Sequence, residues 1–136
     1  MTESQPTKKT ILIVDDEPGL VTYLETLLQD NGYETVSAAD GQIGLEKLKS
    51  ERPDLVTLDI SMPEKSGVRF YRDLKGDPEF ANVPVVIVTA VTGYGGDPEE
   101  FKKFISTRKQ VPPPEGFVAK PVEPEELLSM IKDLLS

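Results

Sequence analysis

Residues 10–18 read TILIVDDEP, an apolar run followed at once by two aspartates. The apolar part, residues 11–14, has the composition of a strand that is buried on both faces. Three later segments repeat this design, each ending in a different polar residue. These are residues 55–58 before Asp59, residues 85–88 before Thr89, and residues 117–119 before Lys120.

Strand-like and helix-like segments alternate along the chain, which predicts an α/β fold with a parallel sheet. Residues 34–38 supply a fifth, weaker strand pattern. Five helices are expected, with apolar residues at helical spacing. They are marked by Leu20, Leu24, Leu27 and Leu28; by Ile43, Leu45 and Leu48; by Val68, Tyr71 and Leu74; by Phe101, Phe104 and Ile105; and by Leu127, Leu128, Ile131, Leu134 and Leu135.

Several helix boundaries carry local signals. Asn31-Gly32 ends the first helix, Asp40 caps the second, and Ser66 is expected to cap the third. Pro98 and Pro124 suit the first turns of the last two helices. In an open parallel sheet the carboxyl ends of the strands share one edge, so the polar residues after the strands should meet there.

Composition limits the function classes. The 136 residues fit one domain, and the formal charge of −9 disfavours binding to nucleic acid or to anionic membranes. The chain has no cysteine and no histidine, which excludes thiolate catalysis and a histidine-based triad. Residues 1–9 are polar and are predicted to be a flexible tail before a domain at residues 10–136, and a cytoplasmic location is expected.

The acidic residues at the predicted sheet edge favour a magnesium site. Crowded carboxylates repel one another unless a cation lies among them, and Mg²⁺ prefers oxygen ligands. Asp16 and Asp59 are the expected direct ligands, with Asp15 acting through water. The alternative for Asp15 and Asp16 is that they merely begin a helix, where acidic residues are favourable.

Asp59 is a candidate nucleophile, because a carboxylate can form an acyl phosphate. Its alternative role is that of a third metal ligand. Lys120 and Thr89 would stabilise the oxygens of a transferring phosphoryl group, although threonine is also common in strands for packing reasons alone.

With these motifs in their order, the chain resembles the receiver domain of bacterial two-component response regulators over about residues 10–136. The resemblance is carried by residues 14–17 (VDDE), residues 58–63 (LDISMP) with Ser66-Gly67, residues 88–90 (VTA) and Lys120-Pro121. It implies a flavodoxin-like (CheY-like) doubly wound sheet of five strands in the order 2-1-3-4-5 with five helices.

The resemblance also implies roles for individual residues. Asp59 corresponds to the phosphoacceptor, Asp15 and Asp16 to the acidic pair, and the backbone carbonyl of Ser61 to a further Mg²⁺ ligand. Thr89 and Lys120 correspond to the residues that sense the phosphoryl group. Phe117 corresponds to the switch aromatic, and a cis bond is expected between Lys120 and Pro121.

The implied function is a phosphorylation-activated switch. A histidine kinase or phosphotransfer protein would donate the phosphoryl group, and the surface of the fourth helix, fifth strand and fifth helix would contact a downstream protein. Catalysis would be limited to self-phosphorylation and autodephosphorylation. The segment between Ala90 and Phe117 is longer than receivers usually need; a docking surface there is favoured, and a loop variation without function is the alternative.

Two other functions remain open from the sequence. A Mg²⁺-dependent aspartyl-phosphate phosphatase of the haloacid dehalogenase class would need a second aspartate two residues after the first, where Ser61 stands. A degenerate receiver would bind partners without phosphorylation, which the complete set of acceptor, acidic pair, hydroxyl and lysine argues against.

Overall fold

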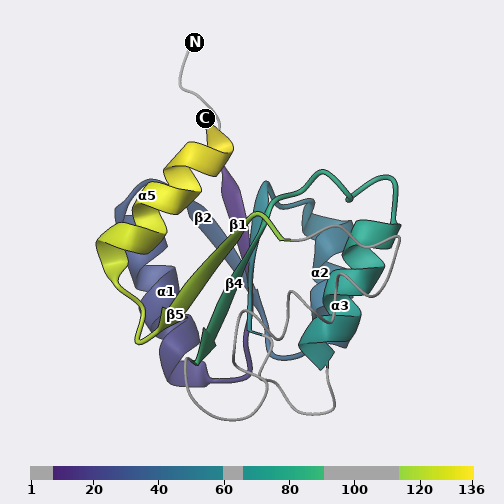
Figure 1. Cartoon of the computed structure of the whole chain (residues 1–136), viewed down its shortest axis with the longest axis horizontal. Coiled ribbons are helices and arrows are strands. Elements are labelled where there is room, and N and C mark those ends of the chain that lie inside the picture. Colours follow the sequence, from purple (N-terminus) through teal and green to yellow (C-terminus); the bar gives the residue numbers. More distant parts are fainter. Residues whose placement is uncertain (1–7, 60–65, 91–113) are drawn as a thin grey trace.

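The computed structural model describes residues 8–59, 66–90 and 114–136 of the chain. Within them, five parallel strands form one sheet in the order β2-β1-β3-β4-β5, as expected (Figure 1). The strands are β1 (Thr10–Val14), β2 (Glu34–Ala38), β3 (Leu55–Leu58), β4 (Val85–Ala90) and β5 (Gly116–Lys120).

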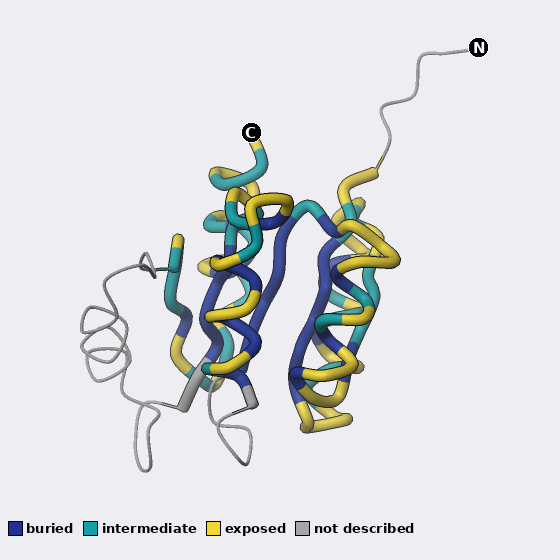
Figure 2. The backbone as a smooth tube through the Cα atoms, turned by 90° about the vertical axis from the view of Figure 1, so that its right-hand side faces the viewer, coloured by how far each residue is buried: buried dark blue, intermediate teal, exposed yellow. Residues whose placement is uncertain are grey.

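The central strands are apolar because helices cover both of their faces. Residues 11–14 of β1 and all four residues of β3 are buried. Figure 2 shows the buried backbone gathered in the strands, while the exposed positions lie mainly on the helices and connections. A continuous apolar run therefore replaces the alternating pattern of a sheet with one face in water.

Four helices lie within the described residues. They are α1 (Pro18–Asp30), α2 (Gly41–Glu51), α3 (Ser66–Gly76) and α5 (Pro124–Leu135). The first and last lie on one side of the sheet, and α2 and α3 lie on the other (Figure 1). The fourth predicted helix, with Phe101, Phe104 and Ile105, falls outside the described residues.

The helix boundaries follow the local signals. The Asp40 carboxylate accepts a hydrogen bond from the Ile43 backbone N–H at 2.8 Å, which caps α2. Asn31 is the C-cap of α1, and Gly32 adopts a positive φ of 91°, which favours glycine. Ser66 was expected to precede the third helix as its cap, but α3 already begins at this residue.

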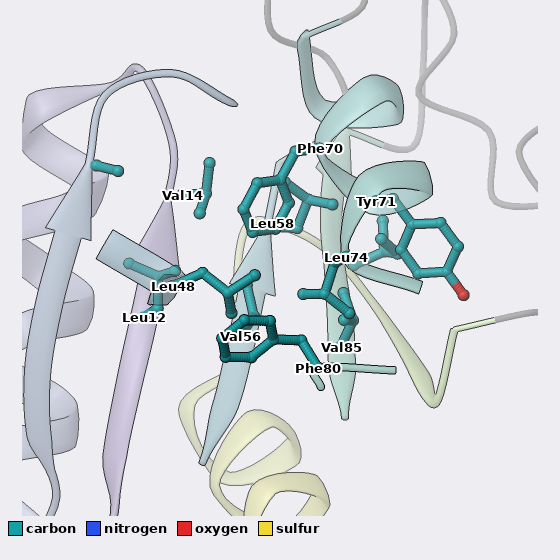
Figure 3. Packing of buried hydrophobic residues seen from close by; sticks show 12 residues of the cluster. Leu12, Val14, Leu48, Val56, Leu58, Phe70, Tyr71, Leu74, Phe80 and Val85 are labelled. Carbon is teal, nitrogen blue, oxygen red and sulfur yellow. The ribbon is translucent and has the colours of Figure 1, made fainter. Parts of the chain in front are cut away.

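Two apolar clusters fill the space between the sheet and its helices. One lies under α2 and α3 and includes Phe70, Tyr71 and Leu74. Figure 3 shows Phe70 beside Leu58 of β3 and Val14 of β1, while the Tyr71 ring points away from these two residues. The other lies under α1 and α5 and includes Leu24, Leu28, Leu127 and Ile131. Both clusters contain strand and helix residues, so the helices pack against both faces of the sheet.

Ile43, one of the three apolar residues that mark α2 in the sequence, does not lie in the core. Its side chain is 36% exposed, whereas Gly41, Gly44 and Leu48 are buried. A Cβ atom on Gly44 would lie only 3.0 Å from the Phe70 ring, so α2 approaches α3 through this glycine. The close contact turns Ile43 toward the surface.

An ion pair with a buried lysine lies where β4 and β5 begin. The Lys75 ammonium is 2.9 Å from the Glu115 carboxylate, and the Lys75 side chain is 1% exposed. It also donates to the carbonyl oxygens of Ala81 and Val83, both at 3.3 Å, while Glu115 accepts the Val85 backbone N–H at 2.8 Å. This Lys75–Glu115 network joins α3 to the first residues of both strands.

No helix in the described part of the chain has the length and apolar composition needed to cross a membrane.

Candidate functional site

The strand ends position three of the predicted site residues. Asp15 follows β1 directly, Asp59 follows β3, and Lys120 is the last residue of β5. Main-chain hydrogen bonds fix the first two, because the Asp15 N–H donates to Ala38 and the Asp59 N–H donates to Val14, at 3.0 and 2.9 Å. Their side chains therefore project from rigid strand ends.

Asp15, Asp16 and Asp59 form a cluster of carboxylates. One oxygen from each lies within 4.8 Å of the others. Asp15 and Asp59 are 3% and 2% exposed, whereas Asp16 is on the surface. The Glu17 backbone N–H donates to Asp15 Oδ1 at 2.9 Å and so orients the first carboxylate. The cluster is thus accessible from the Asp16 side.

Lys120 reaches this cluster from the end of β5, the outermost strand of the sheet on that side. Its Nζ atom lies 3.4 Å from Asp59 Oδ2 and 3.8 Å from Asp15 Oδ2. Its shortest contact is with Glu17 Oε1, at 3.1 Å. The side chain is 18% exposed, so the ammonium is held in place by several carboxylates in a partly dry environment.

The electrostatics of the site show an excess of negative charge. The pKa of Asp15 is raised from 3.8 to about 6, mainly by burial and to a smaller extent by the nearby Asp59 and Glu17 carboxylates, although the hydrogen bond from the Glu17 N–H and the Lys120 charge act in the opposite direction. For Lys120, burial lowers the pKa, but the hydrogen bond to Glu17 and the charges of Asp59 and Asp15 outweigh it and raise the pKa overall. One ammonium does not neutralise the carboxylates around it.

This arrangement fits a divalent cation. Three carboxylates offer oxygen atoms close together, and one of these residues is exposed, which leaves room for waters and for a phosphoryl oxygen. Mg²⁺ is bound in this manner by one or two carboxylates, retained waters and substrate oxygens. The donor set therefore matches the metal expected from the sequence.

The remaining predicted site residues differ in how far the structure describes them. Ser61, whose carbonyl was the expected further ligand, lies outside the described residues. Thr89 is in β4, where its backbone pairs with Ala119, and its side chain is not described. Phe117 is half-buried in β5 and packs against the cluster under α2 and α3. The peptide bond between Lys120 and Pro121 is cis.

Glu17 is the site residue whose contact the sequence did not reveal. It follows the acidic pair in the chain and belongs to the VDDE motif that carries the family resemblance, but the sequence predicts no contact for its side chain. In the structure it is the N-cap of α1, yet its side chain makes no capping hydrogen bond and contacts Lys120, 103 positions away. Only the three-dimensional structure brings these two residues together.

A pocket of about 500 Å³ lies beside this contact. It is lined by Glu17, Leu20, Tyr23, Lys120, Pro121 and Val122, which belong to α1 and to the segment after β5. The polar end of the pocket is thus formed by the Glu17–Lys120 ion pair.

Comparison with known proteins agrees with this site. A family model described as the response regulator receiver domain matches residues 11–132. The polar-differentiation response regulator DivK of Brucella anthropi is 31% identical over 127 residues, which cover 93% of this chain and 96% of DivK.

Solved structures show the same fold. The chemotaxis response regulator CheY4 of Vibrio cholerae matches with a TM-score of 0.79 and 29% identity, covering 95% of this chain and all of the other. The receiver domain of the sensor histidine kinase PA1611 of Pseudomonas aeruginosa PAO1 matches with a TM-score of 0.78 and 25% identity, covering 95% and 98%. That structure holds a magnesium ion in its active-site cleft. By its sequence, strand order and acidic site, the chain belongs to the response regulator receiver domain family.

Proposed function

We propose that this receiver is a switch that accepts a phosphoryl group on Asp59, with Mg²⁺ held by Asp15, Asp16 and Asp59. The observation that carries the proposal is the position of Asp59. Its carboxylate is buried at a strand end, within 4.8 Å of the other two carboxylates and 3.4 Å from the Lys120 ammonium. A nucleophile, a cation site and a fixed positive charge thus meet at one point.

The proposed chemistry is a phosphoryl transfer. An Asp59 carboxylate oxygen attacks the phosphorus of a phospho-histidine, an O–P bond forms, and the P–N bond breaks with its electron pair returning to the imidazole. Bound Mg²⁺ would supply positive charge for the phosphoryl oxygens. Lys120 would donate hydrogen bonds to another of these oxygens, and its fixed position limits the reorganisation needed. Thr89 and the Ser61 carbonyl are proposed in the roles that the family resemblance implies.

The donor would be a histidine kinase or a phosphotransfer protein, since receiver domains in general interact with such proteins and with downstream targets. The state of Asp59 would be read through Phe117 in β5. This side chain is half-buried against the cluster under α2 and α3, and it stands three residues before Lys120. The surface of the fourth predicted helix, β5 and α5 is the proposed contact for a downstream protein.

The direct test is incubation with a small phosphodonor such as phosphoramidate, followed by intact-mass measurement and peptide mapping. With Mg²⁺ present, we expect one phosphoryl group per chain, located on the peptide that contains Asp59. Chelation of the metal should abolish the addition. Absence of any modification with Mg²⁺, or modification of another residue, would contradict the proposed function.

The affinity for Mg²⁺ should depend on pH because Asp15 must lose its proton to favour the cation. With its pKa raised to about 6 in the metal-free fold, a proton competes below that pH. We expect the Mg²⁺ dissociation constant to rise about tenfold between about pH 7.5 and about pH 5, as measured by calorimetry or NMR titration. An affinity that stays flat over this range would contradict the electrostatic description of the site.

The stability of the metal-free protein should fall as the pH rises, whereas the affinity for Mg²⁺ should increase. Because the folded pKa of Asp15 lies above its unfolded value of 3.8, the folded state binds this proton more tightly. The Asp15 contribution therefore stabilises the fold at low pH and is lost as the pH rises from about 4 to about 6. Circular dichroism at both ends of the range would verify that the protein stays folded during the Mg²⁺ titration.

A further inference from the structure

The shortest contact of Lys120 is with a residue outside the carboxylate cluster. Glu17 Oε1 lies 3.1 Å from Lys120 Nζ, compared with 3.4 Å for Asp59 Oδ2 and 3.8 Å for Asp15 Oδ2. The Glu17 side chain is 64% exposed and makes no hydrogen bond to the first turn of α1, although it stands at the N-cap. Its carboxylate therefore interacts with Lys120 instead of with its own helix.

A phosphoryl group on Asp59 would give the Lys120 ammonium new hydrogen-bond acceptors. The negative charge would move outward from the carboxylate to the phosphoryl oxygens, and these oxygens would need hydrogen-bond donors. The Lys120 ammonium has three donors, and the best-placed acceptor in the resting site is Glu17. If the N–H that now points to Glu17 turns to a phosphoryl oxygen, the hydrogen bond to Glu17 breaks.

We propose that Glu17 is a positioning residue that holds Lys120 in the resting site and competes with the phosphoryl group for its ammonium. The inference rests on the proposed phosphorylation of Asp59 and adds a residue that tunes it. Glu17 lowers the affinity of the site for a phosphoryl group while keeping Lys120 within reach of Asp59.

The location of the pair suits a tuning role. An ion pair with one largely exposed partner contributes little free energy, so it biases the site without blocking it. The pocket of about 500 Å³ beside the pair offers space for the Glu17 carboxylate once Lys120 turns away. Release therefore requires no change in the packing of the two apolar clusters.

The test compares Glu17→Gln with Glu123→Gln as a matched control. Glu123 is also exposed, is also an N-cap before a proline, and also makes no capping hydrogen bond with its side chain. The Glu123→Gln substitution removes the same charge at a position three residues after Lys120, and it leaves the Glu17–Lys120 contact unchanged. Beryllofluoride with Mg²⁺, a mimic of the phosphoryl group, is the probe, and binding is followed by NMR titration.

We expect Glu17→Gln to bind the probe about threefold more tightly than the wild type, and Glu123→Gln to match the wild type. Glu17→Asp separates competition from simple charge repulsion, because it keeps the charge on a side chain that is one methylene too short for the contact. It should resemble Glu17→Gln. Thermal unfolding should show all three variants folded, since both glutamates lie on the surface.

Three outcomes of the titration distinguish the role of Glu17 from the phosphorylation of Asp59. Equal affinities for Glu17→Gln and Glu123→Gln, in a protein whose wild type binds the probe, would overturn this inference alone. A wild-type affinity for Glu17→Asp would also overturn it, because charge rather than contact would then be responsible. No response of the wild type to the probe would overturn the proposed function and this inference together.

Discussion

Asp59→Asn is expected to abolish phosphoryl uptake and, at the same time, to stabilise the metal-free protein. Asparagine keeps the shape of the side chain but offers no anionic oxygen to attack phosphorus, and Asp59 is the buried carboxylate closest to Lys120. Phosphorylation by phosphoramidate and Mg²⁺ should fall to background.

The stabilising effect has a separate physical cause. Asp59 contributes to the raised pKa of Asp15 through repulsion, and removal of this charge relieves it. We expect the free energy of unfolding without metal to rise by up to about 1 kcal/mol at neutral pH, as measured by urea denaturation. Loss of function combined with gain of stability is typical of sites that gather like charges for binding.

Asp73→Asn is the matched control for this substitution. Asp73 is exposed on α3, so the variant should keep normal phosphorylation, and its stability should stay within about 0.5 kcal/mol of the wild type. Phosphoryl uptake by Asp59→Asn at the wild-type rate would show that the acceptor lies elsewhere. A lower free energy of unfolding for Asp59→Asn than for the wild type would contradict the proposed repulsion between the carboxylates of the cluster.

The second large effect concerns the Lys75–Glu115 network at the other end of β4 and β5. Glu115→Gln should cost about 3–5 kcal/mol of stability, because it leaves the Lys75 ammonium, with a side chain only 1% exposed, without its counter-charge. The amide can still accept the Val85 N–H, so the loss is mainly that of the ion pair. Urea denaturation at neutral pH measures the change.

Removal of the lysine should cost less. Lys75→Met leaves a carboxylate that is 33% exposed, that can be hydrated, and that keeps its bond to the Val85 N–H, so we expect a loss of about 1–3 kcal/mol. The double variant should be more stable than Glu115→Gln alone because no buried cation remains. Equal losses for the two single variants would contradict the asymmetry in burial on which this prediction depends.

The sheet could be predicted from the sequence because each strand is a local apolar run that ends at a polar residue. The proximity of Asp15, Asp59 and Lys120 could be predicted for the same reason, because parallel strands bring their carboxyl ends to one edge of the sheet. The Asp40 cap and the Asn31-Gly32 stop are likewise local signals that act within a few residues.

Features that depend on packing between distant segments were not predictable. Ile43 marks α2 together with Leu45 and Leu48, but α2 approaches α3 through Gly44, and the spacing of apolar side chains gives no sign of a contact made by glycine. The Lys75–Glu115 pair joins residues 40 positions apart, and Glu17 meets Lys120 across 103 positions. No sequence motif links the two members of either pair, because their contact depends on how the folded sheet places distant segments.

In the proposed function, Asp59, the neighbouring carboxylates and Lys120 form one cation-dependent phosphoryl site. The most direct measurement is a crystal structure of the protein with Mg²⁺ and beryllofluoride at neutral pH. We predict beryllium bonded to an Asp59 oxygen, the metal among Asp15, Asp16 and Asp59, and the Lys120 ammonium on a fluorine with its contact to Glu17 lengthened. Beryllofluoride bound away from Asp59, or Lys120 still paired with Glu17 and distant from the fluorines, would contradict the account.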